Sequence, residues 1–82
     1  MTTSLVFIVN GESTLLGCDG DRPLAHGMRH ALAATNNTAR QLEEWELRTE
    51  RGILLDRDLG ADAHGLVNGE HLFVTLRVGG GG

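Results

Sequence analysis

SLVFIVNGESTLLG, residues 4–17, contains two strand-like apolar runs separated by Asn10-Gly11. An Asn-Gly pair is the strongest short signal for a two-residue β-hairpin, because both residues tolerate the positive φ that the turn requires. We therefore expect one strand over residues 4–9 and a second over residues 13–18. The first strand is apolar on both faces, which is typical of a central strand rather than an edge strand.

The next segment, DGDRPLAHGMRHALAATNNT (residues 19–38), predicts a turn followed by a helix of about three turns. Asp21 is the expected N-cap, and Pro23 suits the first turn, where its missing N–H costs nothing. Gly27 lowers the helix propensity by about 1 kcal/mol relative to alanine, and Asn36-Asn37 is expected to end the helix. One stripe at helical spacing contains Leu24, Met28, Ala31, Leu32 and Thr35.

The second half predicts another hairpin and a final strand. WELRTERGILL (residues 45–55) indicates a strand, a turn at residues 50–52 and a short return strand at residues 53–55. Residues 56–70 are loop-like, with a brief helical turn expected near Leu59. The last strand is expected over residues 71–78, with Leu72, Val74, Leu76 and Val78 on one face.

This order of elements predicts an α+β protein with a β-grasp fold. In that fold a mixed sheet of four to five strands has one main helix packed across it. The first and last strands can lie parallel at the centre, because the chain between them is long enough for a crossover. We expect residues 1–78 to form the domain and residues 79–82 to form a glycine tail.

Composition argues against several classes of function. The 82 residues carry a net charge of −4 and only 4% aromatic side chains, unlike the basic, aromatic footprint of many nucleic-acid-binding proteins. Cys18 is the only cysteine, so an internal disulfide is excluded. The apolar run at residues 5–9 is too short for a signal sequence or a membrane span, and we expect a cytoplasmic protein. Such a short chain leaves little room for an active-site cleft, and we expect no enzyme activity.

Three groups of side chains could bind a metal or take part in catalysis, but for each group the sequence favours a structural or surface role. His26 and His30 are four residues apart on the predicted helix, but two ligands are too few for a metal site. Cys18 is followed by acids, which raise a thiol pKa and oppose nucleophilic activation, so we expect a structural cysteine. The acidic run at residues 43–46 indicates a solvated surface that could face a partner.

The glycines at residues 79–82 are the feature that points to a specific chemistry. Four extended glycines reach about 13–14 Å beyond the last strand. Without Cβ atoms they can thread a narrow channel and leave the terminal carbonyl open to attack. A carboxylate presented in this way suits activation as an acyl adenylate and transfer to a thiol. From composition alone, a flexible end or a linker is an equal alternative.

Several stretches resemble known ubiquitin-like proteins. TLRVGGGG (residues 75–82) resembles the end of ubiquitin, where a Leu-Arg strand end precedes a diglycine. FIVNGE (7–12), ALAATNNTARQLEEWELRTERGILLD (31–56) and LFVTLRVGG (72–80) are similar to a group of small bacterial ubiquitin-like modifiers. Those modifiers are encoded beside an activating enzyme, a conjugating enzyme and a metal-dependent deconjugating peptidase. The resemblance implies a ubiquitin-like β-grasp fold, with these enzymes and target proteins as partners.

The resemblance also implies roles for the tail. The carboxylate of Gly82, next to Gly81, would be adenylated, passed to enzyme cysteines and joined to a target. ATP and Mg²⁺ would be bound by the activating enzyme, so no cofactor is expected in this chain. Arg77, Gly79 and Gly80 would be recognised by the activating enzyme, although Gly79 replaces the second tail arginine of ubiquitin.

Other features limit how far the comparison with ubiquitin extends. Glu46 and Thr75 stand where ubiquitin presents apolar surface residues, so ordinary ubiquitin-binding domains are not expected to recognise this chain. All seven basic residues are arginines, and the chain lacks lysine. The α-amino group of Met1 is therefore the expected acceptor in any self-conjugate. We expect a monomer.

Two alternative functions remain open. A sulfur carrier would bear a C-terminal thiocarboxylate, as in the β-grasp proteins of thiamine and molybdopterin synthesis. A non-covalent ubiquitin-like interaction module would not use the glycines chemically.

Overall fold

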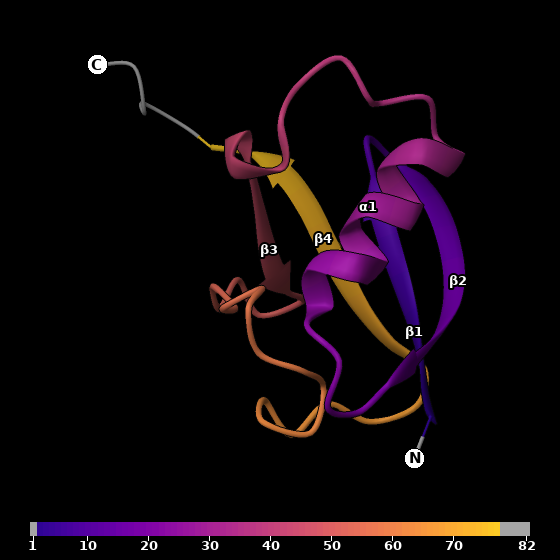
Figure 1. The fold of residues 1–82 in the computed structure, drawn as a ribbon, viewed down its shortest axis with the longest axis vertical. Helices are drawn as coiled ribbons and strands as arrows, with labels where there is room; N and C mark the ends of the chain where they lie inside the picture. Colours follow the sequence, from indigo (N-terminus) through magenta and orange to yellow (C-terminus); the bar gives the residue numbers. More distant parts are fainter. Residues whose placement is uncertain (1, 78–82) are drawn as a thin grey trace.

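A four-stranded mixed sheet with a helix across one face forms the structure, a computed structural model that describes residues 2–77 (Figure 1). The strands are β1 (Thr2–Val9), β2 (Glu12–Asp19), β3 (Trp45–Thr49) and β4 (Glu70–Leu76), in the order β2-β1-β4-β3. β1 pairs antiparallel with β2 and parallel with β4, and β3 pairs antiparallel with β4. The predicted α+β β-grasp fold and the central position of β1 are confirmed. The predicted tail at residues 79–82 lies outside the described residues.

The first hairpin forms as its sequence predicts. Val9 lies opposite Glu12, so Asn10 and Gly11 are the two turn residues. Their φ angles are 50° and 82°, the left-handed values that favour asparagine and glycine in such a turn. Local chemistry at this turn therefore fixes the register of β1 against β2.

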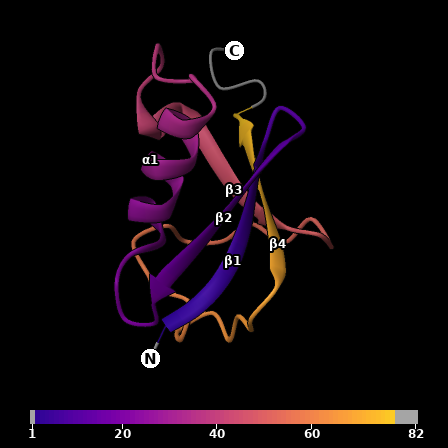
Figure 2. The same ribbon diagram turned by 90° about the vertical axis from the view of Figure 1, so that its right-hand side faces the viewer.

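The hydrophobic core lies between α1 (Leu24–Ala34) and the inner face of the sheet, while the other face of the sheet is left uncovered by the helix (Figure 2). A glycine permits the closest approach of these two layers. A Cβ atom added at Gly27 would lie 2.5 Å from Cζ of Phe7, whose side chain is fully buried. The unfavourable glycine inside the helix is thus required by packing. The buried core residues include Leu5, Phe7, Val9, Leu24, Met28, Ala31, Leu32, Trp45, Leu47, Leu72 and Val74.

The beginning of α1 differs from the prediction, since Pro23 and not Asp21 is the N-cap residue. No side chain caps this end. Instead, the N–H groups of Leu24 and Ala25 donate to the carbonyls of Leu59 and Arg57, each at 2.9 Å. A distant loop therefore satisfies the first helical donors, which need a partner from outside the helix.

The end of α1 follows the prediction. Asn36 has a φ of 59°, and its N–H donates to the carbonyl of Ala33 at 3.2 Å. The N–H of Asn37 donates to the carbonyl of Leu32 at 2.7 Å. These two bonds make a Schellman motif, with asparagine in the left-handed position that glycine usually occupies.

Three predictions for the second half are corrected by the structure. The expected return strand at residues 53–55 is only an isolated bridge between Arg48 and Leu54, because Ile53 and Leu54 are 57% and 56% exposed and gain little from packing. The expected helical turn near Leu59 is a turn in which the N–H of Leu59 donates to Asp56. The segment between α1 and β3, for which no element was predicted, contains a short 3₁₀ helix, η1 (Leu42–Glu44).

Among residues 2–77, no helix has the length and apolarity needed to span a bilayer.

Candidate functional site at the end of β4

β4 is anchored in the core at its middle and reaches the surface at its end. Leu72 and Val74 are buried, at 0% and 1% exposure. Leu76, opposite Trp45 of β3, is 38% exposed, and the following Arg77 is also exposed. The chain therefore reaches the surface from a central strand whose middle residues are buried.

We call the place where the chain leaves β4, at Leu76 and Arg77, the exit of β4. Arg77 is held at this exit by a hydrogen bond of its backbone. Its N–H donates to the carbonyl of Glu44 in η1 at 2.9 Å. Glu44 is itself fixed, since its carboxylate accepts from the N–H of Gln41 at 2.9 Å and pairs with Arg40 at 3.2 Å. No carboxylate among residues 2–77 forms an ion pair with the guanidinium of Arg77, which leaves that side chain available to a partner.

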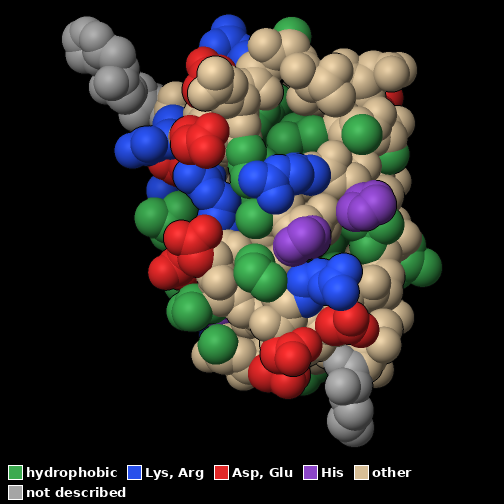
Figure 3. All heavy atoms as spheres, viewed as in Figure 1, with side chains coloured by type: hydrophobic (Ala, Val, Ile, Leu, Met, Phe, Trp, Pro, Cys, Tyr) green, Lys and Arg blue, Asp and Glu red, His purple; other side chains and the backbone are tan. Residues whose placement is uncertain are grey.

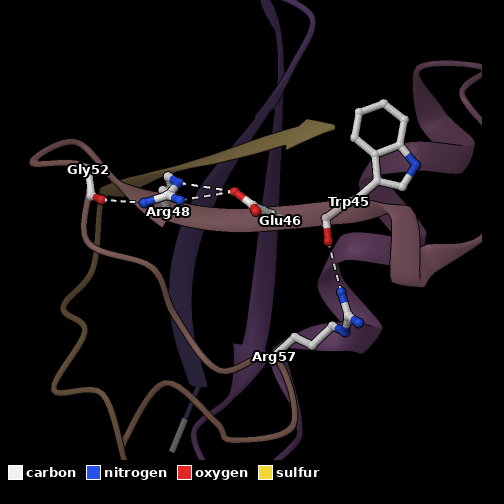
Figure 4. A network of polar contacts seen from close by, with 5 residues as sticks. All are labelled: Trp45, Glu46, Arg48, Gly52 and Arg57. Carbon is white, nitrogen blue, oxygen red and sulfur yellow. Dashed lines mark hydrogen bonds and ion pairs between the residues drawn. The ribbon is translucent and has the colours of Figure 1, made fainter. Parts of the chain in front are cut away.

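A shallow groove of about 240 Å³ runs beside the exit, between β3 and the loop at residues 54–58. Arg57 holds the loop against β3, because its guanidinium donates to the carbonyl of Trp45 at 2.8 Å (Figure 4). The same guanidinium also donates to the carbonyl of Leu42 in η1 at 3.2 Å. The groove is lined by the exposed Leu54 and by charged side chains of both signs. Arg77 therefore belongs to a mixed polar and apolar surface.

The outer face of β3 is polar and ordered. Nε and Nη2 of Arg48 donate to one oxygen of Glu46 at 3.2 and 3.1 Å, and Nη1 donates to the carbonyl of Gly52 at 2.8 Å (Figure 4). Glu46 lies opposite Thr75 of β4. The two positions that differ from the apolar surface of ubiquitin are thus neighbours on this face.

The other candidate side chains lie away from this exit. Cys18 pairs with Thr3 near the start of β1, and β1 and β4 are parallel, so Cys18 is at the opposite end of the sheet from Arg77. Burial, and then the charge of Asp19, raise the pKa of the Cys18 thiol, in the direction expected from sequence. His26 and His30 are exposed on α1, and residues 2–77 contain no cluster of three metal-binding side chains.

The reactive residues predicted from sequence, Gly82 and Gly81, lie outside the described residues, as do Gly79, Gly80 and Met1. Of the predicted recognition residues, the structure places only Arg77.

The sequence analysis did not predict the two elements that support the exit, η1 and Arg57. The first had a local signal, a Gln-x-x-Glu capping box at residues 41–44. The second had none, because its acceptors lie 12 and 15 residues away in the chain.

A family model described as "Protein of Unknown function (DUF2604)" matches residues 2–82. The uncharacterized protein y4jI of Sinorhizobium fredii (strain NBRC 101917 / NGR234) is 35% identical over 75 residues. That alignment covers 92% of this chain and 58% of y4jI, so the chain spans little more than half of its curated relative.

Solved structures are similar in fold at low sequence identity. Caldiarchaeum subterraneum ubiquitin has a TM-score of 0.75 at 12% identity, covering 98% of this chain and 99% of its own. A protein designed de novo from ubiquitin has a TM-score of 0.77 at 16% identity, with coverages of 99% and 95%. The ubiquitin-like domain of EccD5 from Mycobacterium xenopi has a TM-score of 0.67 at 11% identity, with coverages of 94% and 96%. The fold is therefore ubiquitin-like.

Proposed function

The chain belongs to the DUF2604 family, and we propose that it is a ubiquitin-like protein modifier, a substrate of an enzyme cascade and not itself an enzyme. The observation that carries the proposal is the exit of β4. A central strand with Leu72 and Val74 buried is followed by the exposed Arg77, and the sequence continues with Val78 and four glycines. An enzyme could bind the surface around Arg77 while the glycines, which have no Cβ, enter its narrow active site.

In the proposed reaction, the carboxylate of Gly82 attacks the α-phosphate of ATP in the activating enzyme and releases pyrophosphate. A cysteine thiolate of that enzyme then attacks the acyl carbonyl and displaces AMP, which gives a thioester. A second thiol exchange transfers the chain to a conjugating enzyme, and a nucleophile of the target protein finally displaces the thiol. A deconjugating peptidase would reverse the last step by hydrolysis. The adenylate chemistry belongs to the activating enzyme, and this chain supplies the carboxylate and the docking surface.

Arg77 is proposed as a docking residue for the activating enzyme. Its guanidinium is exposed and has no ion pair with residues 2–77, so it can make bidentate contacts to a carboxylate of a partner. Leu54, 56% exposed in the adjacent groove, offers an apolar contact beside it. Gly79 and Gly80 would follow as the part of the tail that the enzyme encloses.

The decisive experiment incubates the chain, ending at Gly82, with ATP, Mg²⁺ and candidate activating and conjugating enzymes of the proposed cascade. Intact-mass spectrometry and denaturing gels should then show covalent adducts. A variant without Gly81-Gly82 should keep its thermal stability, because glycine has no side chain that could add apolar area to a core, and it should form no adduct. A folded truncation that still forms adducts would contradict the proposal.

The role of Arg77 is tested by the rate of adenylation at limiting chain concentration. Arg77→Glu should slow this rate without changing thermal stability. Arg51→Glu is the matched control, because Arg51 is also exposed but lies in the turn after β3, away from the exit. Equal rates for the two variants would count against a role of Arg77 in docking.

A non-covalent ubiquitin-like interaction domain is the second candidate. It is supported by the similarity to the EccD5 domain, which is described as a ubiquitin-like domain and not as a modifier. For this candidate the chain should remain unmodified in the incubation with ATP. A mass increase equal to the exchange of one oxygen for sulfur would instead identify a sulfur carrier.

A further inference from the structure

The same tetrapeptide, Val-Asn-Gly-Glu, occurs twice in the chain, at residues 9–12 and at residues 67–70. Both copies are accessible to solvent, because Asn10 and Asn68 are exposed. Both glycines have a positive φ, 82° at Gly11 and 87° at Gly69. Local sequence and exposure are therefore matched, so a difference in reactivity between the two copies must come from the fold.

An Asn-Gly pair can modify itself in water. The backbone nitrogen of the glycine attacks Cγ of the asparagine side chain and forms a cyclic imide. The side-chain nitrogen leaves as ammonia, with the proton that the glycine nitrogen loses. Water then opens the imide at either carbonyl, which gives aspartate or isoaspartate. Glycine offers the least hindered nitrogen for this attack, because it has no Cβ.

The fold holds both reacting groups of the second copy against β1. Oδ1 of Asn68 accepts from the N–H of Ser4 at 2.8 Å. The N–H of Gly69, which carries the attacking nitrogen, donates to the carbonyl of Ser4 at 2.7 Å. Attack at Asn68 therefore requires that two hydrogen bonds open. Two bonds of ordinary strength correspond to a rate difference of about tenfold or more.

The first copy leaves its reacting groups without such partners. Within residues 2–77 the N–H of Gly11 donates no hydrogen bond, and Oδ1 of Asn10 accepts none. Nδ2 of Asn10 donates to Oδ1 of Asn37 at 3.1 Å, but this nitrogen is the leaving group. The pair also lies at the tip of the hairpin, where local opening disturbs only the last cross-strand pair, Val9 and Glu12.

We propose that Asn10 is the site at which the folded chain deamidates, and that Ser4 protects Asn68 in the identical tetrapeptide. The reactants are the chain itself and water. The two remaining asparagines, Asn36 and Asn37, are each followed by a residue with a side chain, which hinders the attack. The proposal does not depend on conjugation.

The structure also indicates what deamidation would change. A carboxylate at residue 10 cannot donate to Oδ1 of Asn37, and the facing oxygens would repel. Asn37 cannot reverse its amide without losing the bonds from Nδ2 to the carbonyl and the hydroxyl of Thr35, at 3.0 and 2.8 Å. The new charge would lie beside the C-terminal end of α1, where the helix dipole disfavours an anion. Deamidation should therefore weaken the contact between the hairpin and α1.

The modified turn lies at the same end of the sheet as the exit of β4, because β1 and β4 are parallel and Val9 is opposite Val74. Charged side chains of both signs already gather near η1 at this end, at the upper left of Figure 3. A carboxylate at residue 10 would change the charge of this end of the molecule. Any effect on enzyme docking, unlike the deamidation itself, rests on the proposed function.

The test incubates the full chain at mildly alkaline pH below its unfolding temperature and, in parallel, in guanidinium chloride. Cleavage after arginine places Asn10 within residues 1–29 and Asn68 within residues 58–77. Replacement of NH₂ by OH raises the mass of a peptide, whereas isomerisation at Asp19-Gly20 leaves it unchanged. In the folded chain the peptide with Asn10 should gain mass at least about tenfold faster, and in denaturant the two rates should converge.

Several outcomes would overturn the proposal. These are equal rates in the folded chain, faster reaction at Asn68, no reaction at Asn10, or a rate ratio that denaturant leaves unchanged. Asn10→Gly is the control for the site, because glycine also accepts a positive φ, and it should abolish the mass gain of residues 1–29. No enzyme takes part in these measurements, so their failure and a failure of the proposed conjugation are separate results.

Two variants that mimic the aspartate product test the structural consequence. Asn10→Asp and Asn68→Asp add the same charge, but a carboxylate at residue 68 can still accept from the N–H of Ser4. Asn10→Asp should therefore lower the denaturant midpoint of unfolding more than Asn68→Asp does. In an Asn37→Ala background the loss caused by Asn10→Asp should shrink. An equal or larger loss for Asn68→Asp would refute the proposed weakening of the contact with α1.

Discussion

Gly27→Ala is the substitution that best tests the packing of α1 on the sheet. The new Cβ would lie 2.5 Å from Cζ and 2.9 Å from Cε1 of Phe7. Carbon atoms in favourable contact are about 3.5–4.0 Å apart, so the helix or the ring must move by about 1 Å. Phe7 is fully buried in β1, which leaves its ring little room to yield.

The expected magnitude follows from two opposing terms. Overpacking a core costs about 1–3 kcal/mol, whereas replacing glycine by alanine inside a helix contributes about 1 kcal/mol. Gly27→Ala should therefore lower the free energy of unfolding by about 1 kcal/mol. In a Phe7→Leu background the ring is absent, and the same substitution should raise it by up to about 1 kcal/mol. The coupling energy of the pair is then about 2 kcal/mol.

Urea unfolding measures this coupling. The fluorescence of Trp45, the only tryptophan and 3% exposed, reports the transition. Arg29→Ala compared with Arg29→Gly gives the propensity difference at an exposed position of the same helix, expected to be about 1 kcal/mol. Additive effects of Gly27→Ala and Phe7→Leu within about 0.5 kcal/mol would refute the packing argument, as would stabilisation by Gly27→Ala alone.

Three further predictions concern the loop support, the cysteine and self-conjugation. Arg57→Ala removes the donor to two carbonyls and should lower the free energy of unfolding by about 1–2 kcal/mol in urea titrations, whereas the exposed Arg51→Ala should change it by less than about 0.5 kcal/mol. Because burial and Asp19 raise the pKa of Cys18, the folded chain should react with iodoacetamide more slowly than the urea-unfolded chain. The associated stability is present below the ordinary thiol pKa of about 8.5 and should be lost as pH rises through the higher folded pKa, so a gain of stability over that range would contradict the assignment. Without lysine, any polymer of the chain should be joined through the α-amino group of Met1 or through a hydroxyl such as that of Thr2, Thr3 or Ser4. Hydroxylamine, which cleaves esters and spares amides, and tandem mass spectrometry of the junction distinguish these acceptors, and a junction at any other residue would count against the prediction.

The candidate site shows how far sequence reasoning extends. The resemblance to ubiquitin-like modifiers singled out Arg77 as a recognition residue, within a last strand expected over residues 71–78, and the structure places it, exposed, directly after β4. Its ordered surroundings were not predicted, since Glu44 and Arg57 reach the exit through contacts between segments distant in sequence. The roles of the glycines and of Met1 remain predictions.

The sequence by itself determined the features that depend on neighbouring residues. Asn10-Gly11 closes the first hairpin because both can adopt a positive φ, and Asn36 ends α1 for the same reason. The apolar residues on both faces of β1 indicated its central position, because a strand flanked by two others is covered more than an edge strand.

Only the tertiary structure decided features that depend on distant partners. The N-terminus of α1 is capped by carbonyls of residues 57 and 59, which makes a side-chain cap at Asp21 unnecessary. Gly27, unfavourable by propensity, is required by the ring of Phe7. The edge at β3 is covered because residues 53 and 55 hydrogen-bond to it, and β2 is the other edge of the described sheet because of the strand order. A buried donor, a close approach and a free strand edge are each defined by a partner in space, and no local window of sequence contains that partner.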